Sequence, residues 1–320
     1  MSTWVLDTQV EDSKFMKNIN DLNIAFFGSP QMAVYVLDAL LEYIIKPNLI
    51  ISQPDKRSGR GLLLTPPPVK IWAEKNKIPV FQPNTLTDKE IVQTIVNKNT
   101  WDLFIVAAYG KIIPQSILDI PKYGTLNVHP SLLPRLRGAS PIQSAILEEN
   151  ETGITIMLMD EQMDHGPIIA QQKTLIANWP PKASELMKIT GAQGGKMLAE
   201  IIPEWIENKI QAQEQDHTNA TFTKKITKEN GLINLSEDPL KNFRKIQAFN
   251  IWPRAYFYTK NKKSSSNQKT RIIITEATLK NKKLIIKKVI PEGKKEIDYK
   301  IFSQQLNSQN STLGGSTSKC

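Results

Sequence analysis

The sequence predicts an α/β protein: an open, mostly parallel, Rossmann-like sheet with helices on both faces, followed by a small, basic, β-rich domain. Two observations predict the sheet. Short apolar runs, typical of strands buried on both faces, recur between Leu22 and Met159, and segments with helical spacing separate them. Alternation of this kind is typical of parallel sheets. A third observation, a change of pattern and charge near residue 220, predicts the second domain.

Each element is predicted by its own pattern. The first apolar run ends in the turn residues Gly28-Ser29-Pro30. Strands are expected at residues 22–28, 49–52, 78–81, 102–108 and 154–159, and helices at residues 34–41, 70–76, 88–98 and 183–202. A Gly-Ala-Gln-Gly-Gly segment is expected to interrupt the last helix. Ligands bind beyond the carboxyl ends of the strands in such sheets, so residues 109–111 and 127–134 are placed for chemistry.

The domain boundaries follow from composition. Residues 1–20 are expected to be a flexible extension without a signal peptide, because they lack an apolar core segment. The catalytic domain is expected at 21–207, a polar linker at 208–220, a basic domain at 221–302, and a disordered tail rich in Ser, Gln, Asn and Gly at 303–320. Within the basic domain, strands are expected at 255–259, 271–277 and 284–289, with a helix at 239–248.

Composition limits the class of protein. The single cysteine, Cys320, excludes an intrachain disulfide and predicts a reducing, cytoplasmic location. No apolar run is long enough to span a membrane. The net charge is +10, and the segment from Lys224 to Lys300 holds 20 Lys and Arg against 7 Asp and Glu, a net of +13. This asymmetry favours a polyanionic partner over a merely solvated basic face.

Few residues are candidates for chemistry. Asn127 and His129 lie two residues apart in an extended segment, so their side chains point to the same side, and prolines stiffen the loop that follows. Asp164 lies in a turn, and from periodicity alone Asp160 is an equal candidate. The chain has no Gly-x-Ser-x-Gly elbow, no Walker-type loop and no His-Glu-x-x-His metal motif. A site of Asn, His and Asp, without a metal, suits attack by an amine on an activated carbonyl.

A family resemblance adds to this interpretation. Residues 127–143 resemble the signature of the folate-dependent formyltransferases, and the likeness continues through 151–157 and 163–166. It also covers Phe27–Pro30 and 53–61 upstream, and 228–233 and 248–253 downstream. About residues 22–295 are included.

The resemblance implies substrates and site residues. It implies 10-formyltetrahydrofolate as formyl donor, initiator methionyl-tRNA as acceptor, and Asn127, His129 and Asp164 as the catalytic residues. The loop of Ser131, Leu132, Leu133 and Pro134 is expected to bind the folate, presenting backbone groups that the prolines hold in place. The loop with Lys56, Arg57 and Arg60 is expected to enter the tRNA acceptor stem, although Leu62-Leu63-Leu64 stand where the family often has a basic pair.

Further implications and alternatives complete the sequence-based hypothesis. The resemblance suggests a shortened OB-type barrel in the basic domain, and no metal, membrane or obligate protein partner is expected. One alternative is a formyltransferase for a small amine, such as glycinamide ribonucleotide or an amino sugar nucleotide. Another is a hydrolase that passes the formyl group to water. A third is an inactive RNA-binding protein with a relic folate site.

Overall fold

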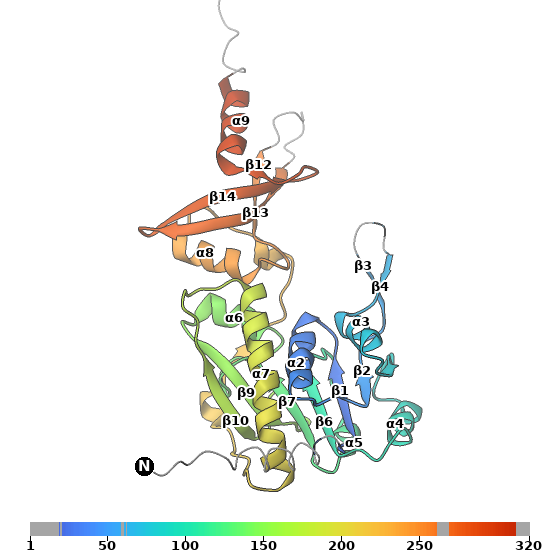
Figure 1. Ribbon diagram of the computed structural model, residues 1–320. Helices are drawn as coiled ribbons and strands as arrows, with labels where there is room; N and C mark the ends of the chain where they lie inside the picture. The colour runs from blue at the N-terminus through green and yellow to red at the C-terminus, as the bar shows by residue number, and fades with distance from the viewer. Residues whose placement is uncertain (1–18, 20, 59–60, 62, 261–268, 312–320) are drawn as a thin grey trace, which may run out of the picture. The chain divides into compact units, whose positions relative to one another are not determined.

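The computed structural model describes residues 19, 21–58, 61, 63–260 and 269–311, so most of the expected extension and residues 312–320 lie outside the described residues. The chain forms two compact units (Figure 1). The first contains the residues up to Pro141, 151–175 and 187–224, and the second contains 142–150, 176–186 and the residues from Lys225 onward. Each unit is described by itself.

The first unit is built on a seven-stranded sheet. Its strand order is β10-β9-β7-β6-β1-β2-β5. The strands are β1 (Ile24–Gly28), β2 (Leu49–Ile51), β5 (Val80–Phe81), β6 (Leu103–Ala107), β7 (Thr125–His129), β9 (Thr152–Leu158) and β10 (Ile168–Thr174). Strands β1, β2, β5, β6 and β7 are parallel to one another, whereas β9 pairs antiparallel with both β7 and β10. The predicted open, mostly parallel sheet is confirmed.

Helices cover both faces of this sheet (Figure 1). Strands β1 and β6 are buried at every position, which explains their unbroken apolar sequences. Alternate residues of each strand enter two separate apolar cores, as Phe26 and Phe27 of β1 do. One core involves α2, α3 and α7, and the other involves α4 and α5. Their bounds are α2 (Gln31–Glu42), α3 (Pro68–Lys75), α4 (Lys89–Val96), α5 (Gln115–Leu118) and α7 (Ala183–Ile206).

The expected break in the last helix of this unit is wrong, because α7 runs without interruption through its glycines. A Cβ atom on Gly194 would lie 2.4 Å from the side chain of Val128 in β7. One on Gly195 would lie 2.5 Å from the carbonyl oxygen of Val36 in α2. The glycines therefore allow close packing of the helix rather than a bend, and close packing is invisible to a local propensity argument.

The expected linker at 208–220 is also wrong, since this segment folds onto the first unit. Gln213 forms a two-way backbone bridge with Ile168 at the start of β10. The chain continues through a short 3-10 helix, η1 (His217–Asn219), into β11 (Phe222–Thr223). Strand β11 pairs in parallel with β8 (Arg137–Gly138), which follows the expected folate loop. The chain passes from the first unit to the second for the last time after Lys224 instead.

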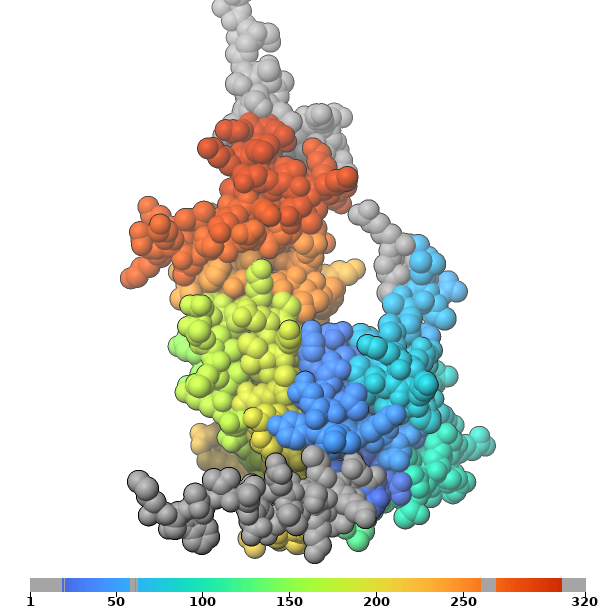
Figure 2. All heavy atoms as spheres, in the orientation of Figure 1, coloured from blue at the N-terminus to red at the C-terminus, as the bar shows by residue number. Residues whose placement is uncertain are grey.

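The first unit also carries a hairpin that projects from its body (Figures 1 and 2). Its strands, β3 (Lys56–Ser58) and β4 (Leu63–Thr65), pair antiparallel. Leu63 and Leu64 are 72% and 67% exposed. Within the described residues, no helix combines the length and the apolar content needed to cross a membrane.

The second unit is a four-stranded antiparallel meander in the order β12-β13-β14-β15. The strands are β12 (Tyr256–Lys260), β13 (Lys269–Lys280), β14 (Lys283–Pro291) and β15 (Ile297–Asp298). The edge strands β12 and β15 do not pair with each other, so the described residues of this small β-rich unit form an open antiparallel sheet. Ile246, Phe257, Ile274 and Val289 belong to its apolar core.

The helices of the second unit revise its expected boundaries. Helix α8 (Pro239–Ala248) begins and ends as predicted. Helix α6 (Pro141–Glu148) joins this unit from the middle of the expected catalytic domain, and Arg244 of α8 donates to its Ile146 carbonyl. Residues 303–311, expected in a disordered tail, lie in α9 (Tyr299–Ser311). Phe302 contributes to the core, which gives this polar helix an anchor. A short 3-10 turn, η2 (Glu229–Gly231), precedes α8.

Candidate active site

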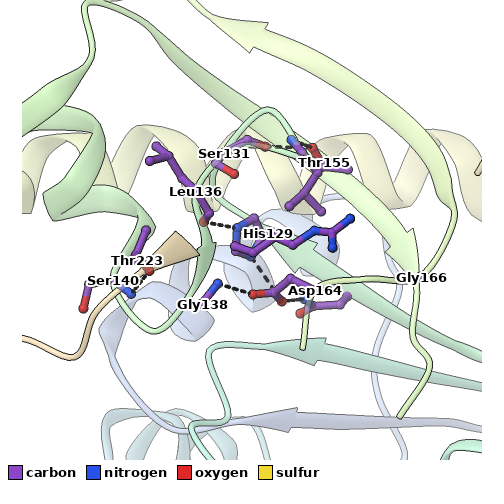
Figure 3. Close-up of polar contacts among 12 residues, drawn as sticks. His129, Ser131, Leu136, Gly138, Ser140, Thr155, Asp164, Gly166 and Thr223 are labelled. Carbon is purple, nitrogen blue, oxygen red and sulfur yellow. Dashed lines mark hydrogen bonds and ion pairs between the residues drawn. The ribbon is translucent and has the colours of Figure 1, made fainter. Parts of the chain in front are cut away.

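Strand β7 carries Asn127 and His129 on the same side, as their spacing predicted. Both side chains approach the Asp164 carboxylate: Asn127 Nδ2 lies 3.5 Å from Oδ1, and His129 Nδ1 lies 3.5 Å from the same oxygen. Asn127 and His129 are 8% and 4% exposed. The structure therefore brings the three predicted residues together in a largely buried cluster at the carboxyl end of β7. Figure 3 shows His129 and Asp164 of this cluster.

The structure separates the two aspartates that the sequence left equivalent. Asp164 points to β7, and its Oδ2 also accepts a 2.7 Å hydrogen bond from the Gly138 amide. Asp160 instead accepts from the His165 ring at 2.7 Å and from the Gln162 amide. The backbone of Asp164 has φ of +53°, a left-handed conformation that asparagine and aspartate adopt more readily than other side chains. This conformation turns Asp164 toward the cluster.

The hydrogen bonds of His129 decide where its proton lies. Its Nε2 is 3.1 Å from the Leu136 carbonyl oxygen, which can only accept, so Nε2 carries a hydrogen. In the neutral ring Nδ1 is then an acceptor, and it faces the Asp164 carboxylate, which is also an acceptor (Figure 3). Two facing acceptors leave a place for one proton between them.

The loop expected to bind folate, Ser131–Pro134, is held by the protein itself. Ser131 carbonyl accepts from Thr155 Oγ1, and the Leu133 amide donates to the same hydroxyl. The Leu133 carbonyl accepts from Gln171 Nε2, and the Pro134 carbonyl from the Thr221 amide. Backbone groups of this loop that were expected to face the folate thus largely form hydrogen bonds within the first unit. A buried loop needs such bonds, because its backbone polar groups cannot reach water. A folate contact of these four residues stays a prediction, and Leu132 and Pro134 are its half-buried members.

Sequence reasoning missed the segment that holds the three residues in place. Leu136 accepts from His129, and the Gly138 amide donates to Asp164. Between them Arg137, only 3% exposed, donates from Nε and Nη2 to Gln215 Oε1 at 3.2 and 2.6 Å. Residues 136–138 lay inside the resemblance without a role, and the only local signal was the glycine. Gln215 lay in the expected linker and had no signal.

The carboxyl end of β6 adjoins the ends of β1 and β2. Gln53 Nε2 donates to the Tyr109 carbonyl at 2.6 Å, and Ser29 Oγ donates to the same oxygen at 3.4 Å. Burial raises the pKa of the Tyr109 phenol to about 12, and its hydroxyl has no hydrogen-bond partner among the residues that the structure describes. Burial lowers the pKa of Lys111 from its ordinary value, and the nearby positive charge of Lys56 lowers it further. Ile112, next along the chain, is 85% exposed.

The basic hairpin has an anchored base. Asp55 accepts from Lys70 Nζ at 2.8 and 3.1 Å and from Gln82 Nε2 at 2.8 Å. These contacts, led by the Lys70 hydrogen bond, hold the pKa of Asp55 below its usual value. Lys56 and Arg57 are exposed on β3, while Arg60 lies outside the described residues. The structure thus places two of the three predicted tRNA-contacting cations on one projecting hairpin.

The described residues contain no group of three or more His, Cys, Asp or Glu side chains that could hold a metal ion. Asn127, His129 and Asp164 supply an amide, an imidazole and a carboxylate at the carboxyl end of β7. Such an arrangement can accept a proton from a nucleophile and donate a hydrogen bond to a carbonyl oxygen.

Comparison with known families identifies this class of protein. Residues 22–202 match the family described as formyl transferase, and the chain belongs to this family. Curated proteins that are similar to this chain include methionyl-tRNA formyltransferases. That of Chloroflexus aggregans is 41% identical over 241 residues, covering 74% of this chain and 76% of the relative. That of Halalkalibacterium halodurans is 40% identical over 236 residues, covering 73% and 74%.

Solved structures share the fold. A methionyl-tRNA formyltransferase from Clostridium thermocellum superposes with a TM-score of 0.55 at 18% identity, over 87% of this chain and 99% of that one. An N-formyltransferase from Helicobacter canadensis, solved with folinic acid and dTDP-3-aminofucose, gives 0.56 at 21% identity over 81% and 88%. At these identities the likeness establishes the architecture.

Proposed function

We propose that this enzyme transfers the formyl group of 10-formyltetrahydrofolate to the α-amino group of methionine on initiator methionyl-tRNA. The observation that carries the chemistry is the pair of facing acceptors, His129 Nδ1 and Asp164 Oδ1, at 3.5 Å. An amine that attacks a carbonyl must lose a proton, and this pair provides a place for it. The acceptor is inferred from the methionyl-tRNA formyltransferases that match about three quarters of the chain.

The residues divide the work of the transfer. The amine attacks the formyl carbon, a bond forms between the amine nitrogen and that carbon, and the bond from the carbon to its carrier nitrogen breaks. Asn127 has two N–H groups on Nδ2, and the one not directed to Asp164 can donate to the oxygen of the formyl group as negative charge develops there. The proton released by the amine passes to the pair of His129 and Asp164, and from there to the departing nitrogen.

The contacts of His129 restrict the part that it can take in this division. The Nε2 hydrogen is committed to Leu136, so the ring offers an acceptor and not a donor to the reacting atoms in its neutral form. His129 becomes a hydrogen-bond donor at Nδ1 only after it has received the proton. We infer that Asn127 is the oxyanion donor and that His129, oriented by Leu136, acts with Asp164 as the base.

The carboxyl ends of the strands carry residues on which a flat, reduced pteridine can lie. When bound, 10-formyltetrahydrofolate supplies an activated formyl carbonyl. Gly110, with φ of +77° and no side chain, and the exposed Ile112 follow β6 and offer an open backbone and an apolar face. Met163, beside Asp164, is 65% exposed and offers a second apolar face. The donor is therefore expected to lie against these residues, with the committed loop 131–134 as support.

Charge supports a tRNA acceptor. The segment from Lys224 to Lys300 has a net charge of +13, and the hairpin adds Lys56 and Arg57. Neutralising phosphates with lysine and arginine provides affinity without base recognition. The contacts of the hairpin with the acceptor stem, including Arg60, are part of the proposal. So is a reducing, cytoplasmic location, which rests on the single cysteine.

The deciding experiment measures formylation by the purified full chain with 10-formyltetrahydrofolate and three acceptors: initiator methionyl-tRNA, elongator methionyl-tRNA and an amino sugar nucleotide. We expect transfer to the initiator alone. Preferred formylation of the sugar would overturn the tRNA assignment, and formate release without acceptor at the same rate would indicate a hydrolase. Asn127→Ala that keeps full activity would remove the amide from the mechanism.

A further inference from the structure

Three successive residues each hold one part of the site. The Leu136 carbonyl accepts from His129, and the Gly138 amide donates to Asp164. Between these two residues, the guanidinium of Arg137 donates two hydrogen bonds, from Nε and Nη2, to Oε1 of Gln215. The segment 136–138 is itself paired with β11. Any movement of this segment would therefore disturb both His129 and Asp164.

Gln215 closes the arrangement from the other side. Its Nε2 donates to the main-chain carbonyls of Asp164 at 3.1 Å and Gly166 at 2.7 Å. The side chain is 5% exposed, and both of its polar atoms are used. The turn that it grips carries the left-handed backbone of Asp164, and a Cβ on Gly166 would lie 2.1 Å from the Leu158 carbonyl oxygen. The conformation of this turn is therefore one that surrounding contacts must maintain.

We propose that Gln215, joined to Arg137, is a positioning residue that holds the Asp164 carboxylate against His129 during formyl transfer. Gln215 reaches the backbone of Asp164, and Arg137 fixes Gln215 beside the Gly138 amide that holds the same carboxylate. The two ends of the Gln215 side chain thus set the carboxylate from its own turn and from the opposing segment. This inference rests on the proposed function, since it concerns the same reaction.

The chain contributes a further support to the Arg137 end. His217 Nδ1 lies 2.9 Å from Arg137 Nη2, so this nitrogen must accept and the ring must be neutral. The His217 ring stacks on the His165 ring with centroids 4.1 Å apart and an angle of 3°. His165 is held in turn by Asp160 at 2.7 Å. No carboxylate forms an ion pair with Arg137 in the part of the chain that the structure describes, so Gln215 and His217 are its polar partners.

The test separates positioning from stability by changing one end of Gln215. Gln215→Glu keeps an acceptor for Arg137, now charged and therefore stronger, and removes both N–H donors to the carbonyls of Asp164 and Gly166. We expect a folded protein whose kcat for formylation falls by about tenfold to 10²-fold, because a small displacement of a reacting group has effects of that size. The KM for methionyl-tRNA should stay within about twofold, since the change lies in positioning and not in tRNA contacts.

Two controls make the interpretation specific. Gln213→Glu adds the same charge two residues away on an exposed side chain and should leave kcat unchanged. In a background of Asp164→Ala, which removes the group being positioned, Gln215→Glu should cause no further loss. A purely structural role would give the same loss in both backgrounds.

The outcomes distinguish the two proposals. If the unmodified enzyme formylates methionyl-tRNA, Gln215→Glu is folded and its kcat equals that of the unmodified enzyme, the positioning role is excluded and the proposed function stands. Equal losses in the presence and absence of the Asp164 carboxylate would also overturn the positioning role. If the unmodified enzyme transfers no formyl group, the proposed function fails first. Should Gln215→Glu not fold, Gln215→Met removes both ends without adding charge and is tested in the same way.

Discussion

The two sheets of this protein bury their strands differently, and the difference matches their proposed tasks. Strand β6 of the first unit is buried at all five positions, whereas β14 of the second alternates between exposed and partly buried residues along most of its length. A sheet covered on both faces can hold polar groups at its edge in a fixed geometry. A sheet exposed on one face can display charge. Under the proposed function, the buried polar groups for chemistry belong to the first unit, and most of the basic surface belongs to the second.

The largest expected effect concerns the contrast in burial. Phe104→Ala in β6 removes a fully buried ring and should destabilise the first unit by about 3–5 kcal/mol. Ile285→Ala in β14, where the side chain is 44% exposed, should cost much less, about 1 kcal/mol. Urea unfolding of the two variants measures both. Equal losses would show that burial on two faces does not distinguish the sheets.

The next effect concerns the catalytic cluster. Asn127→Ala should lower kcat by about 10²–10³, the usual result of losing one oxyanion donor. Affinity for methionyl-tRNA should not change, because Asn127 is buried in the first unit and makes no phosphate contact in the proposal. Single-turnover formylation and an equilibrium binding assay separate the two quantities. A variant that weakens binding and leaves turnover intact would reverse the assignment of tasks.

A smaller effect is expected from the charge of the second unit. Lys280, Lys282 and Lys283 are exposed at the turn between β13 and β14. Changing all three to glutamine should weaken tRNA binding and reduce the slope of log affinity against log salt by about 1 for each phosphate that is no longer neutralised. Binding measured between about 50 and 200 mM salt gives this slope.

The matched control for that variant lies in the first unit. Lys46, Lys77 and Lys89 are also exposed, and their triple glutamine variant removes the same charge. We expect it to bind tRNA with nearly the unmodified salt slope. If both triple variants lose the same affinity, net charge and not the β13–β14 surface is responsible. A flat salt response of the unmodified enzyme would eliminate the electrostatic role altogether.

The smallest effect is a dependence of stability on alkaline pH. The folded protein keeps the Tyr109 phenol protonated to about pH 12, whereas the unfolded chain ionises it near pH 10. Stability conferred by this group is therefore present below about pH 10 and falls toward pH 12, by about 1.4 kcal/mol per pH unit. Tyr109→Phe should remove this component and leave the neutral-pH stability unchanged or slightly higher, because the hydroxyl has no hydrogen-bond partner in the described part of the chain.

Urea unfolding of both proteins across this pH range provides the check. The difference in unfolding free energy between tyrosine and phenylalanine should widen above about pH 10. A constant difference would mean that Tyr109 ionises in the folded state as it does in a free chain, and that the core beneath β6 admits water.

Much of the first unit could be predicted because its strands are continuous apolar runs. Burial on both faces imposes that composition locally, as in β1 and β6. Strand β10 was not predicted because its sequence is mixed. It is an edge strand of the sheet, and three consecutive residues, Gln171, Gln172 and Lys173, are exposed. The glycines of α7 led to the wrong prediction of a break for a related reason. They allow close contact with Val36 and Val128, which the local helix propensity does not reveal.

By itself, the sequence determined the alternating α/β order, the basic second unit and the shared direction of Asn127 and His129, because each depends on neighbours in the chain. Only the tertiary structure showed that Asp164, and not Asp160, lies against Asn127 and His129. It also assigned the His129 proton through Leu136 and brought Gln215 to a turn 51 residues earlier in the chain. The structure also showed that the expected linker pairs with the first unit through Gln213. These features depend on hydrogen bonds between distant segments, and no local pattern of residues encodes the partner of a buried polar group.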